Sequence, residues 1–123
     1  MIERLKKRRD FLAAARGSKS ARSAFVLESR ARGDADPPRF GFTVSKRTAK
    51  SAVVRNRIRR RLREAVRLLA ADEVQAGHDY VVIGRPQALT EPFGKLKTDL
   101  TGALKRVSGA ARSGTAATQK ASG

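Results

Sequence analysis

Hydrophobic side chains recur along the chain with two spacings, one typical of strands and one typical of helices. Alternation with small or polar residues predicts strands over residues 23–30, 39–46 and 77–86. Helical spacing predicts helices over residues 8–16, 52–71 and 90–108. With room for one further short strand, this order predicts an α+β domain in which helices pack on a small sheet.

Residues that start and stop helices lie at the ends of the helical patterns. Gly17 follows the first pattern, in the usual position of a C-terminal stop. Thr90 precedes the third pattern as an N-cap, with Glu91 and Pro92 in the first turn, and Gly109 is expected to end that helix. The stretch ARGDADPPR between the first two strands is rich in turn-forming residues, so these strands are predicted to pair antiparallel.

One domain is expected from the length and the composition. The chain has 123 residues, enough to bury a modest core, and 40% of them are hydrophobic, too many for a wholly disordered chain. We assign residues 1–108 to this domain and expect residues 1–7, which are polar and basic, to be loosely ordered. Residues 109–123 are mostly small and polar, and they are predicted to form a disordered C-terminal tail.

Cysteine and long apolar runs are both absent from the sequence. The lack of cysteine excludes disulfides, thiol nucleophiles and cysteine metal sites, and it fits a reducing cytoplasm. No apolar run approaches the roughly 18–20 residues of a membrane span, and the piece from Phe11 to Ala15 is too short for a signal-peptide core. We therefore expect a soluble cytoplasmic protein without a membrane partner.

No set of catalytic or metal-binding side chains is recognisable. His78 is the only histidine, which excludes a histidine pair. Asp34 and Asp36 lie in the proline-rich turn, while Asp72 and Glu73 follow a basic helix, and neither pair resembles a buried acid–base dyad. We predict no catalytic residue, no metal site and no small-molecule substrate for this chain.

Basic residues outnumber acidic residues by a wide margin. There are 28 Lys and Arg against 11 Asp and Glu, which gives a formal net charge of +17. A charge of this size does not decide the fold, but it makes nucleic acid the first candidate partner and an anionic membrane surface the second.

The stretch RNRIRRR, residues 55–61, lies within the helix predicted for residues 52–71. At about 100° per residue, one arc of about 80° holds the apolar side chains Val54, Ile58, Leu62, Ala65 and Leu69. An opposite arc of about 60° holds Asn56, Arg60, Arg63 and Arg67. Arg57 and Arg59 flank that polar face, while Arg55 and Arg61 lie nearer the apolar edge. The helix is predicted to be apolar on one face and cationic on the other.

The basic side of this helix lacks the acidic neighbours that a solvated helix side normally has. From Arg39 to Arg67 there are eleven Lys and Arg but a single acid, Glu64. Because like charges at i,i+4 destabilise a helix, we infer an anionic partner rather than a solvated face or a nuclear-import tag. Arginine forks suit phosphate, and the amide of Asn56 suits a sugar hydroxyl or a base edge. These features leave both RNA and DNA open.

The stretch AVVRNRIRRRLREAVRLL, residues 52–69, resembles the signature of the bacterial ribonuclease P protein subunit. In that family an RNR triplet follows A-x-x and precedes an apolar residue and further basic residues. Three flanking stretches are also similar to the family, namely RLKKRRDFLAAA, RFGFTVSKR and HDYVVIGRP. The resemblance covers roughly residues 3–108.

The resemblance implies a two-layer α/β sandwich with a small mixed sheet of about four strands and three helices. The RNR helix would form a left-handed βαβ crossover, against the usual right-handed rule. The resemblance also implies a 1:1 complex of a monomeric protein with the catalytic RNA of ribonuclease P. The complex would remove the 5′ leader of precursor tRNA, with Mg²⁺ held mainly by the RNA subunit and the substrate.

The resemblance further implies which side chains meet RNA. Those expected on the RNA-binding surface are Lys46, Arg47, Lys50, Arg55, Asn56, Arg57, Arg59, Arg60, Arg63 and Arg67. Phe11 is expected to line the leader cleft, where bases stack on aromatic rings, and Phe25 and Phe42 extend the cleft unless they belong to the core. A ribosomal-type structural RNA-binding protein and a DNA-binding protein are the alternatives.

Overall fold

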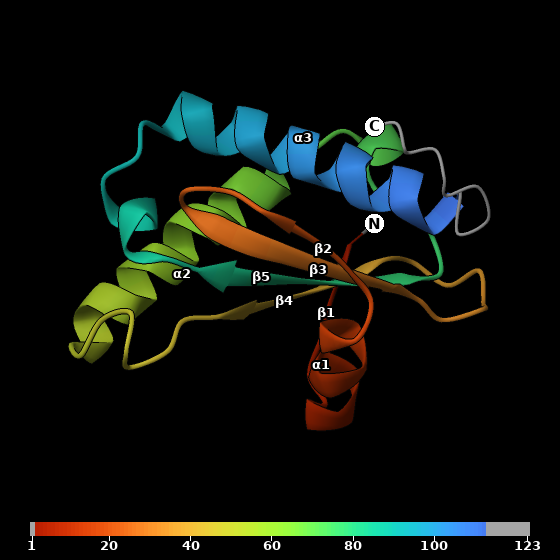
Figure 1. The fold of residues 1–123 in the computed structure, drawn as a ribbon, viewed down its shortest axis with the longest axis horizontal. Helices are drawn as coiled ribbons and strands as arrows, with labels where there is room; N and C mark the ends of the chain where they lie inside the picture. Colours follow the sequence, from red (N-terminus) through yellow and green to blue (C-terminus); the bar gives the residue numbers. More distant parts are fainter. Residues whose placement is uncertain (1, 113–123) are drawn as a thin grey trace.

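The computed structural model describes residues 2–112 and has the predicted α+β architecture. The strands are β1 (Glu3–Arg4), β2 (Ser18–Ala21), β3 (Phe25–Ala31), β4 (Arg39–Thr43) and β5 (His78–Gly84). The helices are α1 (Arg8–Ala15), α2 (Ala52–Arg67) and α3 (Phe93–Arg112), with short 3-10 helices η1 (Ala71–Glu73) and η2 (Pro86–Leu89). The strands form one mixed sheet in the order β1-β4-β5-β3-β2, which is slightly larger than the resemblance implies. In Figure 1, α1 lies on one side of the sheet and α3 on the other.

β5 occupies the centre of the sheet. It pairs in parallel with β4 over residues 79–83 and antiparallel with the whole of β3. The predicted antiparallel pair of β3 with β4 is therefore wrong, because β5 lies between them. The apolar run of β5 is buried on both faces, which favours a central position in the sheet. The turn-rich loop after β3 instead crosses the start of β5, where Gly77 N donates to Asp36 O at 2.7 Å.

α2 connects β4 to β5, so these three elements form a βαβ crossover between adjacent parallel strands, as the resemblance implies. Its left-handed sense stays a prediction. At the sheet edge beyond β4, the chain before α1 is more ordered than predicted. Residues 3–4 form β1 and pair in parallel with β4, and Leu5 N then donates to Phe40 O at 2.9 Å.

The boundaries of α3 differ from the prediction at both ends. The helix begins at Phe93, because Thr90 closes η2 instead of capping α3. It also continues past Gly109 to Arg112, since a glycine in a helix costs about 1 kcal/mol and does not by itself end it. The remainder of the predicted tail, residues 113–123, lies outside the described residues.

The main core lies between the sheet and the helices α2 and α3. Its largest buried side chains include Phe25, Leu27, Phe40, Tyr80 and Val82 from the strands and Ile58, Leu62, Leu96, Leu100 and Leu104 from the helices. The rings of Phe40 and Tyr80 stack with their centroids 4.8 Å apart. A smaller apolar cluster of Leu5, Ala14 and Val81 lies on the opposite face of the sheet, beneath α1.

Replacing Gly84 with alanine is expected to destabilise the protein by about 1–3 kcal/mol, because α2 packs directly on this last residue of β5. A Cβ at Gly84 would lie 2.8 Å from Ile58 Cγ2 and 3.0 Å from Val44 Cγ2. Urea unfolding of the variant measures the loss. Gly94→Ala is the matched control, because a Cβ there meets nothing within 4 Å. Equal unfolding midpoints for the two variants would contradict this packing.

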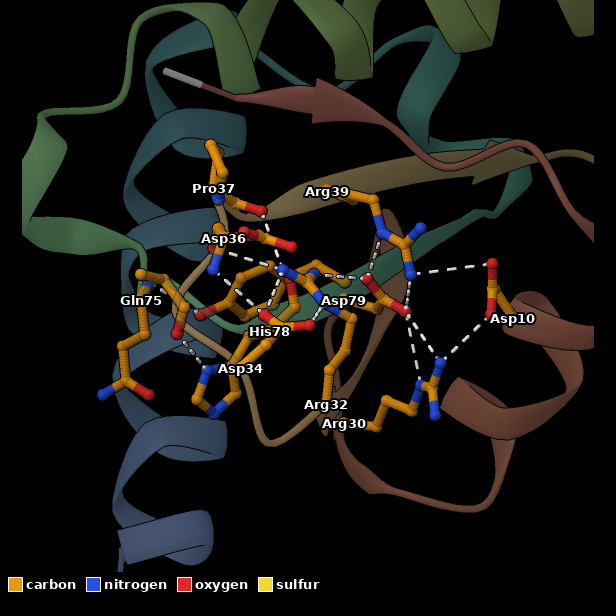
Figure 2. A network of polar contacts seen from close by, with 12 residues as sticks. Asp10, Arg30, Arg32, Asp34, Asp36, Pro37, Arg39, Gln75, His78 and Asp79 are labelled. Carbon is orange, nitrogen blue, oxygen red and sulfur yellow. Dashed lines mark hydrogen bonds and ion pairs between the residues drawn. The ribbon is translucent and has the colours of Figure 1, made fainter.

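A buried ion-pair network joins the strands where β5 begins (Figure 2). The Asp79 carboxylate is fully buried and accepts hydrogen bonds from Arg39 Nε (2.8 Å), Arg32 Nη1 (2.8 Å) and Arg30 Nε (3.3 Å). Asp10 of α1 pairs with Arg30 and Arg39. Burial alone raises the pKa of Asp79, but hydrogen bonds from Arg39 and Arg32 outweigh it and hold that pKa below its ordinary value. The ionised carboxylate therefore joins β3, β4 and β5.

Candidate nucleic-acid interface

α2 is amphipathic in the predicted sense. The hydroxyl of Ser51 accepts a hydrogen bond from Val54 N at 3.3 Å and so caps the helix. Ile58, Leu62 and Ala65 are buried against the sheet, as the helical spacing predicts, and Val66 is buried beside them. The packed stripe leaves the opposite side of α2 in solvent. The five exposed polar residues on that side are Asn56, Arg57, Arg60, Arg63 and Arg67.

Two arginines of the RNRIRRR stretch donate hydrogen bonds to backbone carbonyls of neighbouring loops. Arg55 Nη1 donates to the carbonyls of Ala49 (2.9 Å) and Lys50 (2.8 Å). Arg61 donates to the carbonyls of Ala88 (2.6 Å) and Glu91 (2.7 Å). Arg55, which the resemblance assigns to RNA, is half-buried and holds the loop before α2, and Arg61 holds the loop after β5.

Other cations, in α2 and in the loop before it, have side chains without a hydrogen-bond or ion-pair partner in residues 2–108. They are Lys46, Arg47, Lys50, Arg57 and Arg60, all of them exposed. We call these five side chains, with Asn56, the cationic face. Arg55 ties the loop before α2 to the first turns of the helix, so the cations of this loop lie close to the start of α2.

The remaining predicted arginines of α2 contact side chains close to them, in α2 itself or in β4. Arg59 Nη1 donates to Asn56 Oδ1 at 2.8 Å. Arg67 pairs with Glu64, and hydrogen bonds from Arg67 hold the pKa of Glu64 below its ordinary value. Arg63 lies over the ring of Phe42, with its guanidinium carbon 5.6 Å from the ring centroid.

A groove of about 620 Å³ adjoins these arginines at the edge of the sheet formed by β1 and β4. Arg59, Arg63 and Arg67 line one side of it, and Phe11 and Phe42 are its half-buried aromatic side chains. Cations that neutralise phosphate beside rings on which bases stack are the features of a single-stranded nucleic-acid site. The chemistry of this groove therefore suits a flexible strand of RNA or DNA.

The three phenylalanines predicted for a leader cleft have different positions. Phe11 and Phe42 line the groove. Phe25 does not, because it is only 1% exposed and belongs to the main core, so its assignment to the cleft is wrong. The groove also includes Ile2 and Arg4, which sequence reasoning missed. Their only sequence signal was the basic N-terminus, and the pairing of β1 with β4 brings them to the groove.

The described part of the chain contains no cluster of side chains suited to a metal ion. Among residues 2–112, no three His, Asp or Glu side chains gather where a metal ion could lie. His78 begins β5, and its Nδ1 lies 3.0 Å from Ala76 O. In the same residues, no helix is both long and apolar enough to cross a bilayer.

Comparison with known sequences gives a consistent result. The profile of the family Ribonuclease P matches residues 2–108. The ribonuclease P protein component of Paramagnetospirillum magneticum is 50% identical over 111 residues, covering 86% of this chain and 83% of the relative. That of Gluconacetobacter diazotrophicus is 48% identical over 104 residues, covering 84% and 89%.

Solved structures with a similar fold are also RNase P proteins. The RNase P protein from Thermotoga maritima superposes with a TM-score of 0.70 at 31% identity, over 85% of this chain and 97% of that one. A Staphylococcus aureus RNase P protein mutant, described as defective in mRNA degradation activity, gives a TM-score of 0.72 at 30% identity, over 85% and 87%.

Proposed function

The chain belongs to the family of ribonuclease P protein components, which are subunits of a tRNA-processing endoribonuclease. We propose that its cationic face binds the RNA subunit of this enzyme. The adjoining groove binds the single-stranded 5′ leader of precursor tRNA. One protein molecule joins one RNA, and the protein holds RNA in place while the RNA subunit performs the hydrolysis.

The observation that carries this proposal is the arrangement of one helix. The outer side of α2 presents Arg57 and Arg60, whose side chains have no partner within residues 2–108, and the adjacent side of the same helix presents Arg59 and Arg63 to the groove. A structured RNA and a single strand can therefore be bound by α2 at the same time. A-form RNA offers phosphates and 2′-hydroxyls to such a surface, while an unpaired strand offers bases that stack on Phe11.

The chemistry of cleavage is assigned to the RNA subunit. Mg²⁺ would polarise the scissile phosphate and generate the attacking hydroxide when it is bound by RNA and substrate. The described residues of this chain do not form a group suited to Mg²⁺. The arginines instead neutralise phosphate charge and so favour the close approach of two RNAs.

Reconstitution tests this function. We expect the protein, mixed with a bacterial ribonuclease P RNA at low Mg²⁺ and moderate salt, to accelerate 5′ processing of precursor tRNA above the rate of RNA alone. Polylysine at the same positive charge concentration is the control for non-specific neutralisation. Equal stimulation by polylysine, or no stimulation by the protein, would contradict the proposal and leave a ribosomal-type RNA-binding role.

A further inference from the structure

A row of charged side chains crosses the face of the sheet beneath α1. Arg30 of β3 and Arg39 of β4 each lie directly opposite Asp79 of β5, so all three side chains project from the same face. Asp10 of α1 meets this row, with Oδ1 3.1 Å from Arg30 Nη2 and Oδ2 3.6 Å from Arg39 Nη2 (Figure 2). A single carboxylate therefore ties α1 to two strands.

The next residue of α1 makes the neighbouring contact on the same strand. The ring of Phe11 lies on Gly41, where a Cβ would be 2.5 Å from two of its carbons. Gly41 follows Arg39 by two residues in β4 and so shares its face. The pairs Asp10–Arg39 and Phe11–Gly41 thus set both the rotation of α1 and its position along β4.

α1 packs on β3 and β5, but Asp10 makes the only side-chain hydrogen bond between α1 and the sheet among residues 2–108. The helix has eight residues, of which only Asp10 and Ala14 are buried, and its N-cap residue Lys7 provides no side-chain hydrogen bond. Helices of this length are marginal in water without tertiary support. Ala14 makes a small, non-directional apolar contact with Leu5 and Val81, whereas the Asp10 carboxylate has two arginine partners.

We propose that Asp10 is a positioning residue for leader recognition: its ion pairs with Arg30 and Arg39 hold the Phe11 ring as a wall of the groove. This inference rests on the proposed function of the groove. Asp10 is 7% exposed and does not line the groove, so it acts through α1. The sheet does not depend on the Asp10 carboxylate, because the hydrogen bonds of Asp79 with Arg32 and Arg39 do not involve Asp10.

The test compares two substrates with the enzyme reconstituted from the full chain and a bacterial ribonuclease P RNA. One substrate is precursor tRNA with a 5′ leader, and the other is the same tRNA without the leader. Asp10→Asn is expected to weaken binding of the precursor about tenfold, the effect of one lost base stack, and to leave binding of the leaderless tRNA unchanged. Asp10→Glu restores most of the affinity, since its carboxylate reaches the same arginines.

A double-mutant cycle identifies the route of the effect. If Asp10 acts by placing Phe11, Asp10→Asn adds little to Phe11→Ala. Asp72→Asn is the matched control for charge, because Asp72 is an exposed residue of η1, and it should leave the binding of both substrates unchanged. Arg30→Gln removes one partner of Asp10 without altering α1 and should produce a smaller loss confined to the precursor.

Three results would overturn the inference: an equal loss for both substrates, full additivity with Phe11→Ala, or global unfolding of Asp10→Asn in circular dichroism. A failure of the groove proposal is distinguishable from these, because Phe11→Ala would then show no preference between the two substrates.

Discussion

Asp79→Asn is expected to lower the free energy of unfolding by about 3–5 kcal/mol, the usual cost of removing one partner from a buried ion pair. The side chain keeps its shape but loses the negative charge that three arginines share. Arg32 and Arg39, whose guanidinium groups donate to this carboxylate at 2.8 Å, would remain in the fold with less compensating charge. Urea unfolding followed by circular dichroism measures the loss.

The matched control for this substitution is Asp72→Asn, which makes the same chemical change on an exposed residue of η1. Surface changes of this kind stay within about 0.5 kcal/mol. If the two variants unfolded at the same urea concentration, the network around Asp79 would contribute nothing to stability. The conclusion that the Asp79 carboxylate holds β3, β4 and β5 together would then be wrong.

Arg57→Ala combined with Arg60→Ala is expected to weaken binding of ribonuclease P RNA on the order of tenfold at 0.15 M salt, through loss of two phosphate contacts. The plot of log K against log salt should become shallower by roughly 1.4–1.8, at about 0.7–0.9 per contact. The fold should be retained, because both side chains are exposed and alanine favours a helix. Filter binding across a salt series gives both quantities.

The control pair is Lys105→Ala with Arg106→Ala, which removes the same charge from exposed positions of α3. A change that reflects total charge alone would make the two salt slopes equally shallow, and this outcome would contradict a specific role for α2. A preference of the unaltered protein for duplex DNA over structured RNA at equal salt would contradict the RNA assignment itself.

The amphipathic character of α2 could be predicted because helical periodicity is a local property of the sequence. Ile58 is at the centre of the predicted apolar arc and Leu62 is at one edge of it, and both are buried. Arg60 lies on the opposite arc and is exposed. The periodicity did not distinguish arginines that bind internal carbonyls from arginines in solvent, since Arg61 finds its acceptors at Ala88 and Glu91, far along the chain.

The positions of the aromatic residues could not be read from alternation alone. Phe25 and Phe42 both alternate with smaller residues in strands, yet one is in the core and the other lines the groove. The difference arises from strand order, because β3 is an inner strand covered by α3, whereas β4 lies next to the short edge strand β1. Residues 1–7 are expected to be loose because they are polar and basic, whereas in the fold residues 3–4 pair with β4, a strand far along the chain.

By itself the sequence determined an α+β domain and a helix with one apolar and one cationic face, and it predicted a partner rich in phosphate. These follow from residue type and from spacing within single elements. Only the tertiary structure placed β5 between β3 and β4, brought Asp79 among Arg30, Arg32 and Arg39, and set Phe11 on Gly41. Each of these contacts joins residues far apart in the chain, and their partners are chosen by packing, which no local pattern encodes.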